Sequence, residues 1–444
     1  MIYWRSLQNT TSYLTSSFAQ DSLALNKFKI KYNIMKFIQN ISRLLIGLLF
    51  IFSGFVKAID PLGSTYKFTD YFVAFNMEWL SPAALFLAVA LSSIEFVIGF
   101  ALLNNVYTKI SSVLMFIFMS FFTLLTFYLA LANPVTDCGC FGDAIKLTNW
   151  QTFYKNLVFM IPAGIVFWKR KHFSPRFNRP AQLIIVIVGI LISLYISKQS
   201  YNHLPAIDFR PYKTGTDINL AMNDNLQGAP QPQFETKIVY EKNGEKKTFT
   251  TDNLPDSTWQ WVETISNQTD KGYEPPIHNF LLTNNMKQDV TDLVLNDDGF
   301  TLMIVAYDIE QLPEASYDVL HEISDVGGAN GFNVFIATAS NPEDVDQFKR
   351  EQSLLTKTYF ADPITLKTIV RSNPGIVLLK SGVILNKWHY NDFPQANKMS
   401  EYHLYKASLQ KQHSKTMMLI GFFISIWLLL SAIFEIVGFK SRYS

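Results

Sequence analysis

Long apolar runs divide the chain into parts suited to lipid and a part suited to water. Six runs are long enough to cross about 30 Å of hydrocarbon as helices. Trp79, Trp150 and Trp168 lie near the ends of such runs, as expected for side chains at a membrane interface. The pattern predicts six transmembrane helices, over residues 39–59, 82–103, 110–132, 152–168, 181–197 and 417–438.

The segment between the fifth and sixth runs alternates short apolar stretches with turn signals. Residues 198–272 are typical of a linker followed by a β-hairpin, whose turn is Asn243-Gly244. Residues 273–410 mix strand-like and helix-like patterns, which predicts an α/β domain. Its expected elements are strands at 300–308 and 332–340, helices at 314–327 and 342–352, a hairpin at 375–388 that turns at Ser381-Gly382, and an amphipathic helix from about residue 397.

Charge follows the same division. Residues 198–416 hold 20 Lys and Arg against 28 Asp and Glu, whereas the whole chain has a net charge of +2. No basic stripe with interleaved aromatics is present in this segment, so we expect no nucleic-acid partner. Lys and Arg gather instead at residues 27–43, in the loop 169–179 and at the C-terminus. The positive-inside rule then predicts both termini in the cytoplasm, with loop 133–151 and residues 198–416 outside.

The first 34 residues are polar and rich in Ser, Thr and Asn. We expect them to be a disordered extension or the result of a wrongly assigned start, because Met35 opens a natural membrane-protein beginning, "MKFIQNISRLLIGLLF". A secretory signal peptide over 35–58 is the alternative. It fits less well, since the apolar run is long and no small-x-small site follows it.

The chain has two cysteines, Cys138 and Cys140, in the outer loop "DCGCFGD". A disulfide needs Cα atoms about 4.4–6.8 Å apart, and Gly139 lets the chain bend enough to approach this. Such a bridge is strained and readily reduced, which favours a redox-active dithiol. A structural loop disulfide is the second interpretation, although it closes only a short loop. A metal site is disfavoured, because two thiols without a nearby His leave a zinc ion short of ligands.

Ionisable residues within the first two apolar runs add to the picture. Glu95 lies near the middle of the second run, where a carboxylate is costly and therefore suggests function. It is a candidate for proton handling, or else pairs with a polar neighbour such as Ser53 or Asn156. Lys57 and Arg43 lie toward the ends of the first run, and we expect them to extend to the membrane interface.

The element order of residues 273–410 resembles the thioredoxin-like fold. The resemblance is sharpest at "RSNPGIVLLKSGVILNKW", where Pro374 matches the cis-proline that precedes the penultimate strand in that family. This resemblance implies a peptide-binding loop at Pro374. The family's redox motif belongs after the strand at 300–308, but "YDIEQLPEAS" has no cysteine there. The domain is therefore expected to bind a client or act as a spacer rather than exchange disulfides itself.

The first four runs resemble the MauE and DoxX families of bacterial four-helix membrane proteins. The resemblance rests on "RLLIGLLFIFSGFVKAIDP", on Glu95 with Gly99, and on "DCGCFGD". It implies a part in thiol–disulfide chemistry, since MauE-type proteins are implicated in maturation of methylamine dehydrogenase alongside a thioredoxin-like partner. Here the thioredoxin-like domain is part of the same chain.

These observations predict a membrane all-α protein with an extracytoplasmic α/β thioredoxin-like domain. Its expected function is thiol–disulfide redox or maturation of envelope proteins through Cys138 and Cys140; the alternative is a non-enzymatic membrane assembly or binding protein whose thioredoxin-like domain holds a client. No motif indicates a cofactor, but a dithiol needs an oxidant, and a membrane quinone suits that role. The expected partners are lipid and an envelope protein, and the expected location is the bacterial inner membrane. The predicted parts are the extension 1–34, a four-helix unit at 35–170, a fifth helix at 181–197, a linker and hairpin at 198–272, the thioredoxin-like domain at 273–410 and a sixth helix at 417–438.

Overall fold

The computed structural model describes residues 2–394, with the exception of residues 176, 224–228, 231–232, 251–252, 271 and 279. For residues 2–29, 233–234 and 267–270 it describes the backbone and not the side chains. The predicted helix from 397 and the sixth span, 417–438, lie outside the described residues. What is described forms two compact units, one up to Phe209 and one from Arg210.

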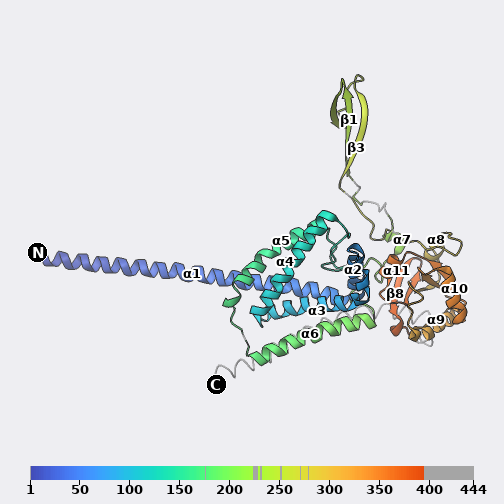
Figure 1. Cartoon of the computed structure of the whole chain (residues 1–444), viewed down its shortest axis with the longest axis horizontal. Coiled ribbons are helices and arrows are strands. Elements are labelled where there is room, and N and C mark those ends of the chain that lie inside the picture. Colours follow the sequence, from blue (N-terminus) through green and yellow to red (C-terminus); the bar gives the residue numbers. More distant parts are fainter. Residues whose placement is uncertain are drawn as a thin grey trace. The chain divides into compact units, whose positions relative to one another are not determined.

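The first unit is a helical bundle (Figure 1). Its α-helices are α1 (Ile2–Ile59), α2 (Pro61–Ala74), α3 (Ala84–Leu103), α4 (Thr108–Ala132), α5 (Asn149–Trp168) and α6 (Arg179–Asn202). Short 3₁₀ helices, η1 (Glu78–Ala83) and η2 (Arg170–His172), precede α3 and follow α5. Helix α1 packs most extensively against α3, α4 packs against α5, and α6 packs against α3.

Four helical stretches of the described chain are long and apolar enough to cross a membrane: Ile30–Ile59, Glu78–Leu103, Thr108–Ala132 and Arg179–Asn202. They contain the predicted spans 39–59, 82–103, 110–132 and 181–197. The predicted span 152–168 forms α5 but is not among these four, because the first half of α5 carries Asn149, Gln151, Lys155 and Asn156.

The outer surface of the bundle is apolar, as a membrane requires. Large hydrophobic side chains are exposed on several helices, among them Phe86, Ile117, Phe121, Leu124, Leu131 and Ile161. A soluble protein rarely exposes so much contiguous apolar surface, whereas lipid solvates it. These side chains and the four long helices together identify the first unit as membrane-embedded.

Helix α1 begins earlier than expected. Residues 2–34 form its first half, where the sequence predicted an extension that is disordered or the result of a wrongly assigned start. The first glycine of the chain is Gly47 and no proline precedes it, so no residue of this segment interrupts a helix. The prediction about the start at Met35 stays a prediction.

Small residues let α1 and α3 approach closely. A Cβ atom on Gly54 would lie 2.4 Å from the Phe96 nitrogen, and one on Gly99 would lie 2.5 Å from the Ile51 nitrogen. Backbone atoms cannot move aside as side chains do, so only glycine fits at either position. This close crossing sets α1 and α3 side by side and brings Lys57 of α1 within reach of Glu95 of α3.

The second unit contains two sheets. A three-stranded antiparallel sheet consists of β1 (Gln233–Lys242), β2 (Glu245–Thr250) and β3 (Gln260–Asp270) in the order β2-β1-β3. The predicted hairpin with its turn at Asn243-Gly244 is confirmed as β1 and β2, and both turn residues have positive φ. Strand β3 was not predicted, since its sequence is rich in Gln, Asn, Thr and Glu and reads as a polar loop.

The larger sheet has the strand order β6-β5-β4-β7-β8. Strands β4, β5 and β6 are parallel, while β7 is antiparallel to both β4 and β8. This parallel half joined to a C-terminal antiparallel hairpin is the topology of a thioredoxin-like fold. Its elements are α7 (Ile218–Ala221), α8 (Thr291–Leu295), β4 (Phe300–Val305), η3 (Glu314–Ser316), α9 (Tyr317–Asn330), β5 (Asn333–Thr338), α10 (Pro342–Glu351), β6 (Lys357–Phe360), α11 (Pro363–Ile369), β7 (Gly375–Lys380), β8 (Val383–His389) and η4 (Tyr390–Asp392).

Apolar residues on alternate positions of the central strands hold this domain together. Leu302 and Ile304 of β4 pack with Ile336 of β5 and Ile376 of β7 in one buried cluster. Helices α9 and α10 cover it with Leu320, Ile323, Val345 and Phe348. The predicted hairpin turn is confirmed, because Ser381 and Gly382 both have positive φ between β7 and β8.

Candidate functional site

The loop that carries both cysteines is tied at its two ends. Helix α4 ends at Ala132, and Asn133 follows with a left-handed φ of +47°. At the start of α5, the Asn149 amide donates to Asn133 Oδ1 at 2.9 Å and to the Val135 carbonyl at 2.8 Å. Thr148 caps α5 in a capping box with Gln151. The loop is therefore held at a fixed place beside the bundle.

A tight turn brings the two thiols together. The Gly139 N–H donates to Asp137 Oδ1 at 2.9 Å, and Gly139 has a φ of +66°. The Cys138 and Cys140 side chains are free thiols and hydrogen-bond to each other. Cys138 is buried, whereas Cys140 is half-buried. The two thiols are therefore neighbours, as the two sulfur atoms of a disulfide must be.

A buried ion pair lies directly beneath the turn. Lys57 Nζ is 2.7 Å from Glu95 Oε2, and it also donates to Ser53 Oγ at 2.8 Å and to the Cys140 carbonyl at 2.9 Å. The Ser53 hydroxyl lies 2.9 Å from both Glu95 Oε2 and the Cys140 carbonyl. Lys57 and Glu95 are 8% and 4% exposed. Side chains of α1, supported by Glu95 of α3, therefore hold the cysteine turn by hydrogen bonds to the Cys140 carbonyl.

Helix α2 contacts the turn from another side. Lys67 Nζ forms an ion pair with Asp137 at 2.9 Å, and the Tyr71 hydroxyl donates to the Cys138 carbonyl at 3.0 Å. The two side chains are one helical turn apart, so they share a face of α2. Asp60 caps this helix by accepting from the Gly63 N–H at 2.8 Å, and Pro61 begins it.

A second lysine approaches from α5. Lys155 Nζ lies 4.0 Å from the centroid of the Phe141 ring, directly after the cysteine turn. The same ring packs edge-on against Phe52 of α1, with centroids 5.3 Å apart. Phe141 therefore fixes the end of the turn against α1 while holding an ammonium group near the thiols.

These surroundings give the two thiols different acidities. The hydrogen bond from Cys138 lowers the pKa of Cys140 to about 7, and the positive charges of Lys155 and Lys57 act in the same direction against burial. The same hydrogen bond, together with burial, raises the pKa of Cys138 well above its usual range. The pKa of Tyr71 is also raised, chiefly by burial. Near neutral pH the reactive thiolate is therefore on Cys140.

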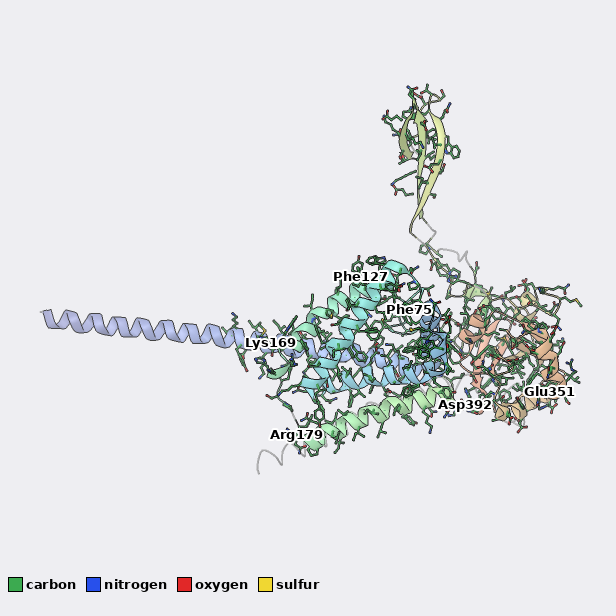
Figure 2. All side chains as sticks on the ribbon, in the orientation of Figure 1. Phe75, Phe127, Lys169, Arg179, Glu351 and Asp392 are labelled. Atoms are coloured by element: carbon green, nitrogen blue, oxygen red, sulfur yellow. The ribbon has the colours of Figure 1, made fainter. Side chains whose placement is uncertain are left out.

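An apolar cavity of about 370 Å³ opens beside the thiols. Cys138 and Cys140 are among its lining residues, as are Lys57, Glu95 and Lys155. Aromatic side chains make a large part of its wall, including Phe75, which follows α2 and is labelled in Figure 2. The aromatic lining residues are Phe50, Phe68, Tyr71, Phe72, Phe75, Phe121, Phe122 and Phe141.

The structure brings Glu95 to Cys138 and Cys140, three residues selected from the sequence. Glu95 pairs with Ser53, as one interpretation proposed, but Asn156 instead donates to Thr126 Oγ1 at 3.1 Å. The expectation that Lys57 extends to the membrane interface is wrong, because Glu95, Ser53 and the Cys140 carbonyl offer three acceptors inside the bundle.

Arg43 does not extend freely into the interface either. Its guanidinium donates to the carbonyls of Leu102 and Leu103, at the last turn of α3, and lies over the Phe173 ring. A cation at this end of a helix is favourable because the last carbonyls lack helical partners. Arg43 therefore fastens α1 to the end of α3 opposite the cysteine turn.

Three residues of the site were not selected from the sequence: Lys67, Tyr71 and Lys155. The first two lie in residues 60–81, which were expected to be a loop. The Asp60-Pro61 pair was a helix-start signal that would have revealed α2, and with it the shared face of Lys67 and Tyr71. Lys155 had no such signal, since its role depends on the position of Phe141.

In the thioredoxin-like domain, the Asn373–Pro374 peptide bond is cis, which confirms that part of the prediction. The Asn373 amide donates to the Asp308 carbonyl at 2.7 Å, just after β4. The loop of Pro374 is thus fastened to the place where the family's redox motif belongs. Neither of the two cysteines of the chain lies in this domain. Among the described residues, no group of three or more His, Cys, Asp or Glu is arranged to hold a metal ion.

Comparison with known proteins finds two family matches. Residues 35–169 match the family described as methylamine utilisation protein MauE. Residues 234–271, which contain nearly all of β1 to β3, match a domain of unknown function, DUF8463. No curated protein matches the chain.

Solved structures similar to the chain include StoA from Bacillus subtilis, with 15% identity over 28% of this chain and 94% of that one and a TM-score of 0.22. A putative thioredoxin from Neisseria meningitidis is 17% identical over 30% of this chain and 88% of that one, with a TM-score of 0.22. The thioredoxin domain of a Bacteroides vulgatus thiol-disulfide oxidoreductase is 12% identical over 29% and 89%, also with a TM-score of 0.22. The membrane region of this chain thus matches the MauE family, and a domain of thioredoxin-like topology follows it in the same chain.

Proposed function

We propose that the chain is a membrane thiol–disulfide oxidoreductase whose reactive pair is Cys138 and Cys140. The observation that carries this proposal is the hydrogen-bonded pair of thiols in a turn fixed by Lys57 and Tyr71. Two thiols of unequal acidity, one half-exposed and one buried, suit the two steps of disulfide exchange. The match of residues 35–169 to the family described as methylamine utilisation protein MauE supports the same assignment.

The exchange follows from the two environments. In the oxidised protein, a client thiolate attacks Cys140 Sγ, the Cys138–Cys140 bond breaks, and Cys138 leaves and takes a proton. A second client thiolate then attacks the client sulfur of this mixed disulfide, and Cys140 leaves as a stable thiolate. The client is oxidised by two electrons, and the protein pair is reduced by the same two. Glu95 pairs with Lys57, and we propose that it accepts protons transiently from the reduced pair and passes them on.

Single serine variants test these roles. Because the chain has no other cysteine, thiol-specific mass tags count the pair directly. In proteoliposomes with a synthetic peptide dithiol, we expect the wild type to oxidise one peptide per protein and the double variant Cys138→Ser/Cys140→Ser to oxidise none. When a peptide disulfide is supplied, Cys138→Ser accumulates a mixed disulfide through Cys140, while Cys140→Ser does not. Peptide oxidation by the double variant would contradict the proposal.

The thioredoxin-like domain is proposed to hold the client. It lacks cysteines, so it contributes no electrons, but the loop of Pro374 lies where relatives of this fold meet extended peptide. An envelope protein with unpaired thiols is the partner that this arrangement suits. The double variant Cys138→Ser/Cys140→Ser is expected to bind the client peptide as the wild type does. Client binding by this variant would separate the holding role of the domain from the redox role of the cysteines.

The basic clusters at residues 27–43 and 169–179 support a cytoplasmic N-terminus and an outward-facing cysteine loop. We propose that the protein lies in a bacterial inner membrane with residues 198–394 in the periplasm. Ser381, at the exposed turn between β7 and β8, offers a test. A Ser381→Cys substitution in the Cys138→Ser/Cys140→Ser background is expected to react with an impermeant maleimide in intact spheroplasts. If residue 381 is labelled only after the membrane is broken, the proposed orientation is wrong and this domain faces the cytoplasm.

A further inference from the structure

The cavity beside the thiols has the composition of a site for an apolar ring compound. Its volume of about 370 Å³ falls within the range of roughly 300–1,000 Å³ that is common for small-molecule sites. Leu49, Leu91 and Leu125, together with Met77 and Met119, line it beside the aromatic rings. Phe121 lines the cavity and is also 60% exposed on the outer face of α4. One wall therefore includes a side chain that meets lipid, which gives an apolar molecule a route from the membrane.

The cavity is polar only where the cysteine turn closes it. Cys138 and Cys140 lie at that end together with the Lys57–Glu95 pair. Lys155 of α5 also lines it, and its ammonium group can donate to a carbonyl oxygen. A ligand with an apolar body and carbonyl oxygens at one end matches both surfaces. A phospholipid acyl chain matches only the apolar walls, since it brings no acceptor to the lysines.

The redox balance of the cycle further restricts which ligands suit this cavity. After each client is oxidised, the pair is left as two thiols, and the next cycle requires removal of two electrons and two protons. The cavity reaches the two sulfur atoms from a wall that includes the lipid-facing Phe121, so an oxidant that enters by this route is membrane-soluble. An isoprenoid quinone has an apolar tail, two carbonyl oxygens and a capacity for two electrons and two protons.

We propose that this cavity binds a membrane quinone and that the quinone reoxidises Cys138 and Cys140. This inference rests on the proposed function and names the oxidant of the same site. The Cys138 Sγ–Cys140 Sγ bond forms as the two thiols lose two electrons and two protons, and the quinone takes up both to become a quinol. Lys155 lies close enough to the thiols to offset negative charge as the quinone is reduced.

The test uses the full chain, reduced and held in nanodiscs without oxygen, with ubiquinone-1 as the probe. Loss of quinone absorbance is followed together with loss of taggable thiols, and one quinol is expected per disulfide formed. Leu125→Trp fills the cavity, whereas Leu124→Trp places the same side chain on the adjacent, lipid-facing position of α4. Since one methylene in an apolar pocket changes discrimination by roughly 10-fold to 200-fold, we expect Leu125→Trp to slow oxidation by quinone at least ~10-fold and Leu124→Trp to leave it unchanged.

Diamide, a water-soluble thiol oxidant, separates the possible failures. If diamide and a peptide disulfide oxidise the pair while ubiquinone-1 does not, the quinone inference is overturned and the proposed exchange stands. If neither peptide nor diamide reacts, the exchange itself fails. A photoreactive azidoquinone gives a measurement that does not depend on folding of the tryptophan variant. It is expected to label peptides that contain Phe122 or Phe72, in competition with ubiquinone-1; labelling elsewhere, or displacement by phospholipid alone, would count against the site.

Discussion

Replacing Lys57 by methionine is expected to destabilise the membrane unit by about 3–5 kcal/mol, the usual result of removing one partner of a buried ion pair. The substitution leaves Glu95 buried with Ser53 as its remaining hydrogen-bond donor. It also removes one of the two donors to the Cys140 carbonyl, the other being the Ser53 hydroxyl. Denaturant or SDS titration of the purified protein, read by fluorescence or by thiol accessibility, measures the loss.

Two comparisons make this prediction specific. Lys67→Met breaks the ion pair between Lys67 and Asp137, whose side chains are 33% and 28% exposed. Because this pair is partly solvated, its loss is expected to lower the stability of the membrane unit by no more than about 1 kcal/mol. The double variant Lys57→Met/Glu95→Leu removes both buried charges and is expected to recover most of the stability lost by Lys57→Met, because no unpaired charge remains. Equal losses for Lys57→Met and Lys67→Met would show that burial of the pair contributes nothing.

The hydrophobic pattern predicted the membrane helices well because lipid imposes a long apolar run on each of them. It missed α2, whose 14 residues are too short to span and carry Lys67, Asp70 and several hydroxyls. Hydropathy alone therefore describes the part of the bundle that meets lipid and not the part that covers the cysteine turn. That part carries Lys67 and Tyr71, which contact Asp137 and the Cys138 carbonyl.

The buried ion pair of Lys57 shows why a functional site is harder to predict from sequence than a transmembrane helix. Its position near the end of an apolar run suggests an interfacial lysine, and only the close crossing of α1 and α3 at Gly54 and Gly99 reveals a different outcome. Its partner Glu95 is 38 residues away along the chain. A pairing of this kind depends on the distance between two helices, which no local pattern contains.

The second unit was predictable where the chain turns sharply. Asn243-Gly244 and Ser381-Gly382 both adopt positive φ, so the two hairpins follow from their turn residues. Strand β6 has four residues and α11 has seven, which is too few to produce a clear period. Both were missed, although Asp362-Pro363 is a helix-start signal of the same kind as Asp60-Pro61.

The acidity of Cys140 leads to a second large effect, on the rate at which its thiolate reacts. With a pKa of about 7, Cys140 is half thiolate at neutral pH, so alkylation should rise with pH up to a midpoint near 7 and then level off. The donor that lowers this pKa most is the Cys138 thiol, and Lys155 and Lys57 assist it, whereas burial and Glu95 oppose it. Removing the donor therefore shifts the midpoint upward, and never downward.

Cys138→Ala removes the donor, whereas Cys138→Ser keeps a hydroxyl that can still donate to the Cys140 sulfur. An ordinary thiol of pKa ~8.5 is only a few per cent thiolate at pH 7, so we expect alkylation of Cys140 at pH 7 to fall roughly tenfold in Cys138→Ala and much less in Cys138→Ser. Lys155→Gln should also raise the midpoint, while Lys155→Arg should preserve it. Rates of iodoacetamide labelling between pH 5 and 9, read for the Cys140 peptide by mass spectrometry, measure each midpoint. If Cys138→Ala keeps the wild-type midpoint, the thiol pair does not set the acidity of Cys140, and the division of labour between an attacking Cys140 and a resolving Cys138 loses its physical basis.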